Sequence, residues 1–398
     1  MTAFSTEIFQ HATLDHVAHN PGPGDAIETV LSRGDFAAAV DEIRTWPGYA
    51  PTPLHRLDAL AARLGLGGIH YKDEGPRFGL GSFKALGGAY AALRLLQREL
   101  TAMRGHEVSA ADIRAGRYKA DVAGITLVSA TDGNHGRSLA WGAQMFGAPC
   151  RIYIHKDVSA GRADAMAALG AHITRIDGDY DASVARARKD AEDNGWFVVS
   201  DTSWPGYSQP PRDVMAGYGM MLAEVTAAMP TAPSHVFVQA GVGGLAAAVA
   251  AALVQHWGAD APRIVVVEPA LAACLLASAK AQAARSVAID AETIMAGLSC
   301  GEPSPLAWQI LSQCVQDFLT IEDSLVPPTM RLLAQPLPGD AAIDAGESAV
   351  AGLAALIAAS QQPELAGALG LKADSTVLLI GSEGVTDAAI FSTIMAGV

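Results

Sequence analysis

The chain is poor in cysteine, aromatic residues and positive charge, and it lacks a long apolar segment. Four cysteines in 398 residues are too few for a disulfide scaffold, and none stands in a spacing typical of zinc sites. The net charge of −14 and the absence of a basic cluster argue against nucleic-acid binding. The longest weakly apolar run, residues 242–254, is shorter than the roughly 20 residues of a membrane span. Because residues 1–20 also lack a basic and apolar leader, we expect a cytoplasmic protein.

Hydrophobic residues make up 50% of the chain, and short β-branched segments alternate with alanine-rich segments of helical periodicity. This alternation predicts an α/β fold with mostly parallel sheets. It falls into two sets, from which we expect a large domain of residues 1–87 and 213–398 and a smaller domain of residues 88–212. The expected strands are residues 125–129, 151–154, 172–176, 197–199, 235–239, 264–268, 317–321 and 376–381, and the clearest helices are 184–194, 214–228 and 245–257.

The first motif that carries chemistry is the segment GSFKALGG, residues 81–88, in which Lys84 lies between an aromatic residue and a small-residue helix start. Burial of such a lysine disfavours its ammonium form, and the neutral amine is then able to attack an aldehyde. We interpret Gly87 and Gly88 as leaving room for a planar ring. Taken alone, a surface lysine before a helix is the more common explanation of such a segment.

The second motif is SATDGNHG, residues 129–136, which follows an expected strand and opens a helix. Backbone N–H groups at a helix start bind anions and carboxylates, and Asn134 is able to hydrogen-bond a ring hydroxyl. An ordinary Asx turn with a helix cap explains the segment equally well.

The third motif is the glycine-rich turn QAGVGGL, residues 239–245, again between a strand and a helix. Converging amides and a helix dipole make such a turn suitable for a phosphate group. The turn is not a G-x-G-x-x-G segment, which argues against a dinucleotide.

The fourth motif is GSEG, residues 381–384, at the end of the last expected strand. The hydroxyl of Ser382 is suited to meeting a ring nitrogen there, although a simple strand-to-helix turn is the more economical reading of this motif alone.

Taken in this order, the four motifs resemble fold-type II pyridoxal-phosphate enzymes, the tryptophan synthase β-like group. The resemblance runs from about residue 52 to residue 387 and implies two three-layer αβα domains, a cofactor and active site in the cleft between them, and a homodimer. Within the group, several further segments are similar to diaminopropionate ammonia-lyase, namely residues 72–74, 77–80, 130–137, 201–202, 204, 206–207, 296–298, 300–303 and 346–348.

The resemblance implies α,β-elimination that converts D- and L-2,3-diaminopropionate to pyruvate and ammonia, with a small-molecule amino acid as substrate. We assign no metal to the site residues, and dependence on a monovalent cation stays open. The resemblance also implies that Lys84 carries pyridoxal 5'-phosphate as an imine beside Phe83, that Asn134 binds the ring oxygen, and that Ser382 faces the ring nitrogen. The phosphate would be held by Gly241, Val242, Gly243, Gly244 and Leu245.

Two carboxylates favour an amine as the leaving group. Serine and threonine dehydratases of this fold usually have a small or hydroxyl residue in place of Asp132, whose carboxylate is able to pair with the 3-amino group or take the α-proton. The resemblance assigns Lys84 as the base for the L-isomer and Asp132 for the D-isomer. Asp201 either binds an amino group or tunes Asp132, or else anchors a loop.

Two other functions stay open on the sequence. One is a serine or threonine dehydratase-like β-eliminase, or a β-replacement enzyme, and the other is an inactive regulatory homologue. We expect His135 to be a packed residue rather than a catalyst. Lys72 and Arg77 either contact the substrate carboxylate or pair with Asp73 and Glu74.

Overall fold

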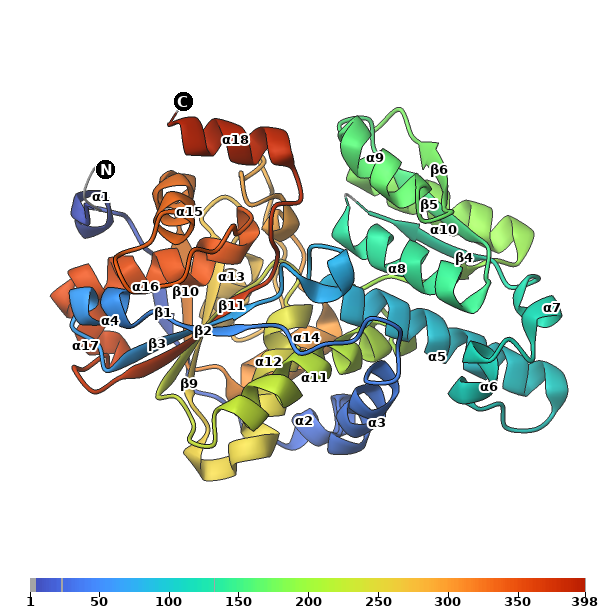
Figure 1. The fold of residues 1–398 in the computed structure, drawn as a ribbon, viewed down its shortest axis with the longest axis horizontal. Helices are drawn as coiled ribbons and strands as arrows, with labels where there is room; N and C mark the ends of the chain where they lie inside the picture. Colours follow the sequence, from blue (N-terminus) through green and yellow to red (C-terminus); the bar gives the residue numbers. More distant parts are fainter. Residues whose placement is uncertain (1–4, 23, 132, 398) are drawn as a thin grey trace. The chain divides into compact units, whose positions relative to one another are not determined.

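The computed structural model describes residues 5–22, 24–131 and 133–397. The chain divides into two compact units, both visible in Figure 1. The larger unit comprises Met1–Arg33, Pro51–Pro76 and Met221–Val398, and the smaller one comprises Gly34–Ala50 and Arg77–Met220. The eight expected strands are confirmed to within two residues at either end.

The division differs from the expected one, because residues 34–50, 77–87 and 213–220 belong to the smaller unit. Aromatic packing explains part of this grouping. The ring of Trp46 lies 5.7 Å from that of Trp141 and 6.0 Å from that of Phe78, and the ring of Tyr218 lies 4.6 Å from that of Phe83.

The sheet of the larger unit has seven strands among the described residues, in the order β1-β10-β9-β8-β11-β3-β2. The five central strands run parallel, and the short outer strands β1 and β2 pair antiparallel with β10 and β3. The bounds are β1 His16–Ala18, β2 Leu54–Arg56, β3 Gly68–Asp73, β8 His235–Gln239, β9 Arg263–Pro269, β10 Asp317–Ile321 and β11 Thr376–Gly381.

Both faces of this sheet are apolar, as a parallel sheet covered by helices requires. Phe237, Val265 and Leu379 point toward one face and share a core cluster with helix α16. Their neighbours along the strands point to the other face, since successive strand residues alternate. The helices of this unit are α1 Glu7–Gln10, α2 Asp25–Val30, α4 Asp58–Leu64, α12 Gly244–Trp257, α13 Cys274–Ala281, α14 Pro305–Cys314, α15 Val326–Ala334, α16 Ala351–Gln361, α17 Pro363–Leu369 and α18 Ala388–Ala396.

The sheet of the smaller unit is parallel throughout, in the order β6-β5-β4-β7. Its faces are covered by different helices. Tyr153 packs with Ala187 and Ala191 of α10, whereas its neighbour Ile152 faces Gly136 of α8. The strands are β4 Leu127–Ala130, β5 Cys150–Ile154, β6 His172–Arg175 and β7 Phe197–Val198.

The helices of the smaller unit include α3 Arg33–Ile43, α5 Lys84–Arg104, α6 Ala110–Arg114, α7 Lys119–Val122, α8 Asn134–Phe146, α9 Ala160–Ala167 and α10 Tyr180–Asn194. Helix α11, Gln209–Ala228, begins in the smaller unit and ends in the larger one. In the part of the chain that the structure describes, no helix combines the length and the apolar character needed to cross a membrane.

Glycines bring α5 into close contact with α8 and α11. A Cβ atom on Gly87 would lie 2.5 Å from the ring of Tyr218, and one on Gly88 would lie 2.6 Å from Ser138 Oγ. The space beside this glycine pair is therefore filled by neighbouring helices. Our interpretation that the pair leaves room for a planar ring was wrong.

Gly217 tests this packing. A Cβ atom there would lie 2.6 Å from the backbone oxygen of Leu86 and 3.0 Å from Gly87 Cα, and backbone atoms of a helix cannot move aside cheaply. We expect Gly217→Ala to lower the free energy of unfolding by about 1–3 kcal/mol, as overpacking does. Urea denaturation followed by circular dichroism measures this loss.

Gly161 in α9 is the matched control, because a Cβ atom there meets nothing within 4 Å. Gly161→Ala should leave the stability unchanged or raise it by up to about 1 kcal/mol, through its better helix propensity. Equal effects of the two substitutions would contradict the close-packing argument.

Candidate active site

Lys84 is the first residue of α5, and its ammonium group forms an ion pair with the carboxylate of Asp201. The side chains are 24% and 20% exposed, so the pair is shielded but reachable. Lys84 Nζ also lies 5.9 Å from the ring centroid of Phe83, which is itself buried. The structure thus brings together three of the residues that the sequence predicted for the site.

The charge of Lys84 determines the ionisation of Asp201. Burial alone would raise the pKa of this carboxyl, but the Lys84 ammonium and its hydrogen bond hold the pKa well below the usual range. Asp201 is therefore a carboxylate at neutral pH. Its carboxylate accepts a hydrogen bond from Lys84 Nζ.

The segment that carries Asp201 is anchored from two sides. His135 Nε2 lies 2.9 Å from the backbone oxygen of Val199. The hydroxyl of Tyr207 accepts from the backbone N–H of Ser200 and donates to the backbone oxygen of Val198, both at 2.9 Å. These bonds fix the backbone directly before Asp201. Tyr207 has no predicted role, although it belongs to a segment that the sequence singled out.

His135 is buried, and burial lowers its pKa. The ring is therefore neutral, and Nε2 must carry the hydrogen because a backbone oxygen only accepts. Its Nδ1 atom is buried and has no partner within the described ranges. The ring packs and anchors, as the sequence indicated.

Asn134 is the first residue of α8, directly before His135. The residue is half-buried. Asp132, the predicted base for a D-substrate, lies outside the described residues.

The glycine-rich turn joins β8 to α12 in the larger unit. No side chain caps α12, and its N-cap residue Gly243 has a φ of 98°, which favours glycine. At Gly241, a Cβ atom would lie 2.9 Å from Cys300 Sγ and 3.2 Å from Leu298 Cα. The turn therefore needs glycine at positions 241 and 243, and the N-cap residue Gly243 has no side chain to cap the first amides of α12. Val242, Gly244 and Leu245 complete the predicted set in this turn.

Ser382 follows β11 in the same unit and is buried. Its hydroxyl oxygen accepts a hydrogen bond of 2.7 Å from Nε2 of Gln239, the last residue of β8. The sequence did not mark Gln239 as a site residue.

Comparisons with known proteins agree with this geometry. Residues 45–383 match the model of the family described as pyridoxal-phosphate dependent enzymes. Diaminopropionate ammonia-lyase of Escherichia coli (strain K12) is 39% identical over 347 residues, which cover 85% of this chain and 86% of that enzyme. The chain belongs to the diaminopropionate ammonia-lyases, a family of pyridoxal-phosphate dependent enzymes.

Two further similarities support the assignment to this lyase family. The Salmonella typhimurium enzyme of that name is also 39% identical, over 88% of this chain and 89% of its own. A crystal structure of the E. coli enzyme, in complex with an aminoacrylate-PLP azomethine reaction intermediate, matches with a TM-score of 0.84. It is 34% identical and covers 96% of this chain and 97% of that one.

The residues present fit the pyridoxal phosphate of this family. An uncapped helix start with glycines before it suits a phosphate group. The side chain of Lys84 is 24% exposed, so an aldehyde is able to reach it, and Ser382 carries a hydroxyl, a group that is able to hydrogen-bond a ring nitrogen.

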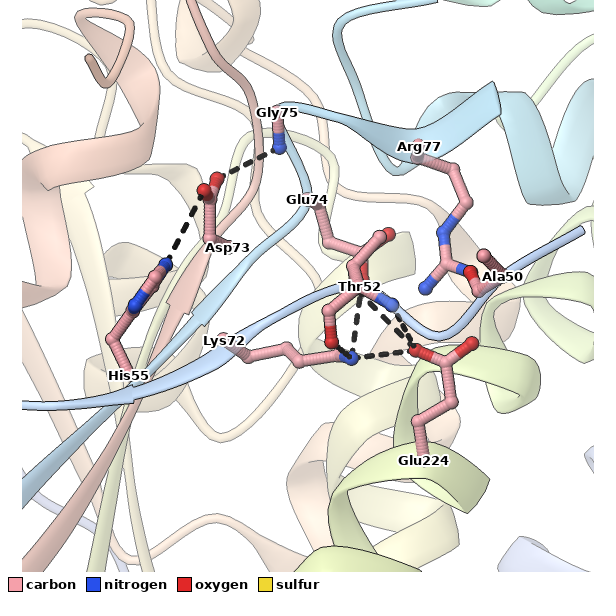
Figure 2. A network of polar contacts seen from close by, with 9 residues as sticks. All are labelled: Ala50, Thr52, His55, Lys72, Asp73, Glu74, Gly75, Arg77 and Glu224. Atoms are coloured by element: carbon pink, nitrogen blue, oxygen red, sulfur yellow. Dashed lines mark hydrogen bonds and ion pairs between the residues drawn. The ribbon is translucent and has the colours of Figure 1, made fainter. Parts of the chain in front are cut away.

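A buried polar network in the larger unit settles the role of Lys72 (Figure 2). Lys72 is 1% exposed, and its Nζ lies 2.5 Å from Glu224 Oε2, 2.7 Å from the backbone oxygen of Thr52 and 3.9 Å from Glu74 Oε1. The hydroxyl of Thr52 donates to Glu74 at 2.6 Å. Glu224, in α11, was not foreseen.

These contacts decide between the two roles open to Lys72. It pairs inside the protein, chiefly with Glu224, and its burial leaves no surface for a substrate carboxylate. Arg77 of the smaller unit is equally buried, and its Nη1 donates to the backbone oxygen of Ala50 at 3.3 Å.

Removing the Lys72 charge should destabilise the protein strongly. Lys72→Met removes the ammonium group that contacts the buried carboxylates of Glu224 and Glu74, and breaking a buried ion pair costs about 3–5 kcal/mol. Urea denaturation measures the effect, and the double variant Lys72→Met/Glu224→Gln should recover part of it.

The exposed pair Lys189–Asp193 in α10 is the control, with side chains 67% and 54% exposed. Lys189→Met should change the free energy of unfolding by no more than about 1 kcal/mol, as for surface pairs. A similarly small effect of Lys72→Met would show that the network is not needed for folding.

Proposed function

We propose that the protein converts D- and L-2,3-diaminopropionate to pyruvate and ammonia by α,β-elimination. The observation that carries the proposal is the ion pair of Lys84 and Asp201 at the start of α5, in a chain of the diaminopropionate ammonia-lyase family. One diaminopropionate and one water give one pyruvate and two ammonia. The α-proton leaves Cα, the 3-amino nitrogen leaves the adjacent carbon, and water replaces the second nitrogen.

Bound pyridoxal phosphate supplies an electron-withdrawing ring that stabilises negative charge at Cα of an attached amino acid. The amides of residues 241–245 are assigned to its phosphate, and Asn134 and Ser382 to the ring oxygen and the ring nitrogen. Phe83 lies beside the lysine, with its ring centroid 5.9 Å from Lys84 Nζ.

Lys84 is assigned as the base for the L-isomer. When Lys84 is not bonded to the cofactor, its nitrogen is a free amine. In its neutral form this amine takes the α-proton and becomes an ammonium group. Asp201 is placed to hold that ammonium, because its carboxylate already accepts from Lys84 Nζ. The charge that proton transfer creates is thereby stabilised inside a partly shielded site.

Asp132 is assigned as the base for the D-isomer, in which the α-proton points to the opposite face. A carboxylate and a lysine on opposite faces allow one enzyme to act on both isomers. The 3-amino group is cationic at neutral pH, so carboxylates near it also favour an amine over a hydroxyl as the leaving group.

A cytoplasmic homodimer is part of the same proposal. Support comes from the few, unclustered cysteines and from the resemblance to a dimeric family.

The reaction is tested by product stoichiometry. The cofactor-loaded protein is incubated with D- and L-2,3-diaminopropionate and, separately, with D- and L-serine, and pyruvate and ammonia are assayed. We expect two ammonia per pyruvate from both diaminopropionate isomers and slower turnover of serine, which yields one. Lys84→Ala should abolish activity, whereas Lys280→Ala, at a side chain that is 56% exposed, should not. Faster turnover of serine would instead favour a dehydratase.

The two-base assignment is tested by Asp132→Asn. An amide cannot accept the α-proton, so turnover of the D-isomer should fall by about 10²–10⁴, the usual contribution of a catalytic base. Turnover of the L-isomer should largely persist, because Lys84 is untouched. Steady-state rates with each pure isomer measure the difference, and equal losses for both isomers would rule out the split.

A further inference from the structure

Gln239 makes a contact that the proposed mechanism does not use. It is the last residue of β8 and the first residue of the glycine-rich turn, and it is fully buried. Strands β8 and β11 pair in parallel, with Leu379 opposite Phe237, so Gln239 reaches the end of β11. There its Nε2 atom lies 2.8 Å from the backbone oxygen of Ile380 and 2.7 Å from Ser382 Oγ.

The chemistry of these partners fixes the direction of both hydrogen bonds. A backbone oxygen only accepts, so the atom facing Ile380 must be the amide nitrogen. That nitrogen has two hydrogens, and it donates one to Ile380 and the other to Ser382. Because an amide nitrogen does not accept, the hydroxyl hydrogen of Ser382 is directed to a different acceptor.

The arrangement is retained at an energetic cost. Gln239 Oε1 is buried and has no partner within the residues that the structure describes. A buried acceptor without a hydrogen-bond partner is unfavourable, and an apolar side chain of similar size would avoid it. A glutamine whose nitrogen is fully used while its oxygen is unsatisfied indicates that the donor direction matters at this position.

We propose that Gln239 is a positioning residue that makes Ser382 a hydrogen-bond donor toward the pyridine nitrogen of the cofactor and so keeps that nitrogen unprotonated. The inference rests on the proposed contact of Ser382 with the ring nitrogen. Donation from Gln239 polarises the Ser382 hydroxyl and makes it a stronger donor, since linked hydrogen bonds reinforce one another. An unprotonated ring withdraws less charge from Cα, which favours loss of the β-amino group over prolonged carbanion storage.

Gln239→Glu reverses the hydrogen bond. An ionised carboxylate only accepts, and a protonated one must spend its single hydrogen on Ile380, so in both states the oxygen near Ser382 accepts the hydroxyl hydrogen. Ser382 is then left to accept from the ring, which favours a protonated nitrogen. Gln239→Met removes the N–H donor to Ser382 and puts no hydrogen-bond acceptor in its place. It serves as the second variant in case Gln239→Glu folds poorly.

The test reads the ring nitrogen directly. Wild type and variants are reconstituted with 15N-labelled pyridoxal phosphate, and the nitrogen resonance is recorded together with the visible spectrum and the dissociation constant of the cofactor. We expect the wild-type resonance at the position of unprotonated pyridine and a large upfield move in Gln239→Glu. Gln239→Met should move it less. The exposed Gln282→Glu makes the same chemical change elsewhere in the larger unit and should leave the resonance unmoved.

Ser382→Ala separates this inference from the contact on which it rests. If Ser382→Ala moves the resonance and neither Gln239 variant does, the Ser382 contact stands and the role of Gln239 is refuted. If Ser382→Ala also leaves the nitrogen resonance unmoved, or if the wild-type ring nitrogen is protonated, then the proposed contact of Ser382 with the ring nitrogen is refuted, and the role of Gln239 with it. Loss of the diaminopropionate reaction with the expected resonances would refute the proposed substrate alone.

Discussion

Parallel strands place their carboxyl ends at one edge of a sheet, and the chemistry of each unit depends on this constraint. In the larger unit, β8 and β11 end side by side, so Gln239 and Ser382 come into hydrogen-bond contact across 143 residues of sequence. In the smaller unit, β4 and β7 are paired and parallel, and they lead into the segments that carry His135 and Asp201. If one strand of either pair ran in the opposite direction, the segments that follow the two strands would lie at opposite edges of the sheet and these contacts would not form.

The same constraint explains which parts of the fold the sequence could predict. Four of the eight expected strands, β8, β9, β10 and β11, are almost entirely buried and apolar, so their composition marks them. Strands β1 and β2 have three residues each, too few to show a pattern. Strand β3 has the sequence Gly-Ile-His-Tyr-Lys-Asp. Lys72 makes this segment look exposed in the sequence, and only the structure shows that its charge is paired with that of Glu224.

Site residues divide in a similar way. Lys84, Asp201 and the glycine-rich turn stand in local motifs, so the sequence alone was enough to propose them for the site. Gln239 and Glu224 act through partners far away in the chain, and a single sequence contains no signal of such pairings. Gly87 and Gly88 led to a wrong interpretation for a different reason. Small residues indicate that another group packs closely against the chain, but they do not identify that group. Here helices α8 and α11 occupy the space that seemed suited to a ring.

Two lysines twelve positions apart show how burial separates structure from chemistry. Lys72 and Lys84 both form ion pairs with a carboxylate, so pairing alone does not distinguish them. Lys72 is 1% exposed and surrounded by fixed acceptors, which leaves its nitrogen no room for a covalent partner. Lys84 is 24% exposed, so a small aldehyde is able to reach its nitrogen once the ammonium group has lost a proton. A lysine that must exchange a bond and a proton in each turnover needs this intermediate degree of burial, because full burial would lock the ammonium and full exposure would leave it unoriented.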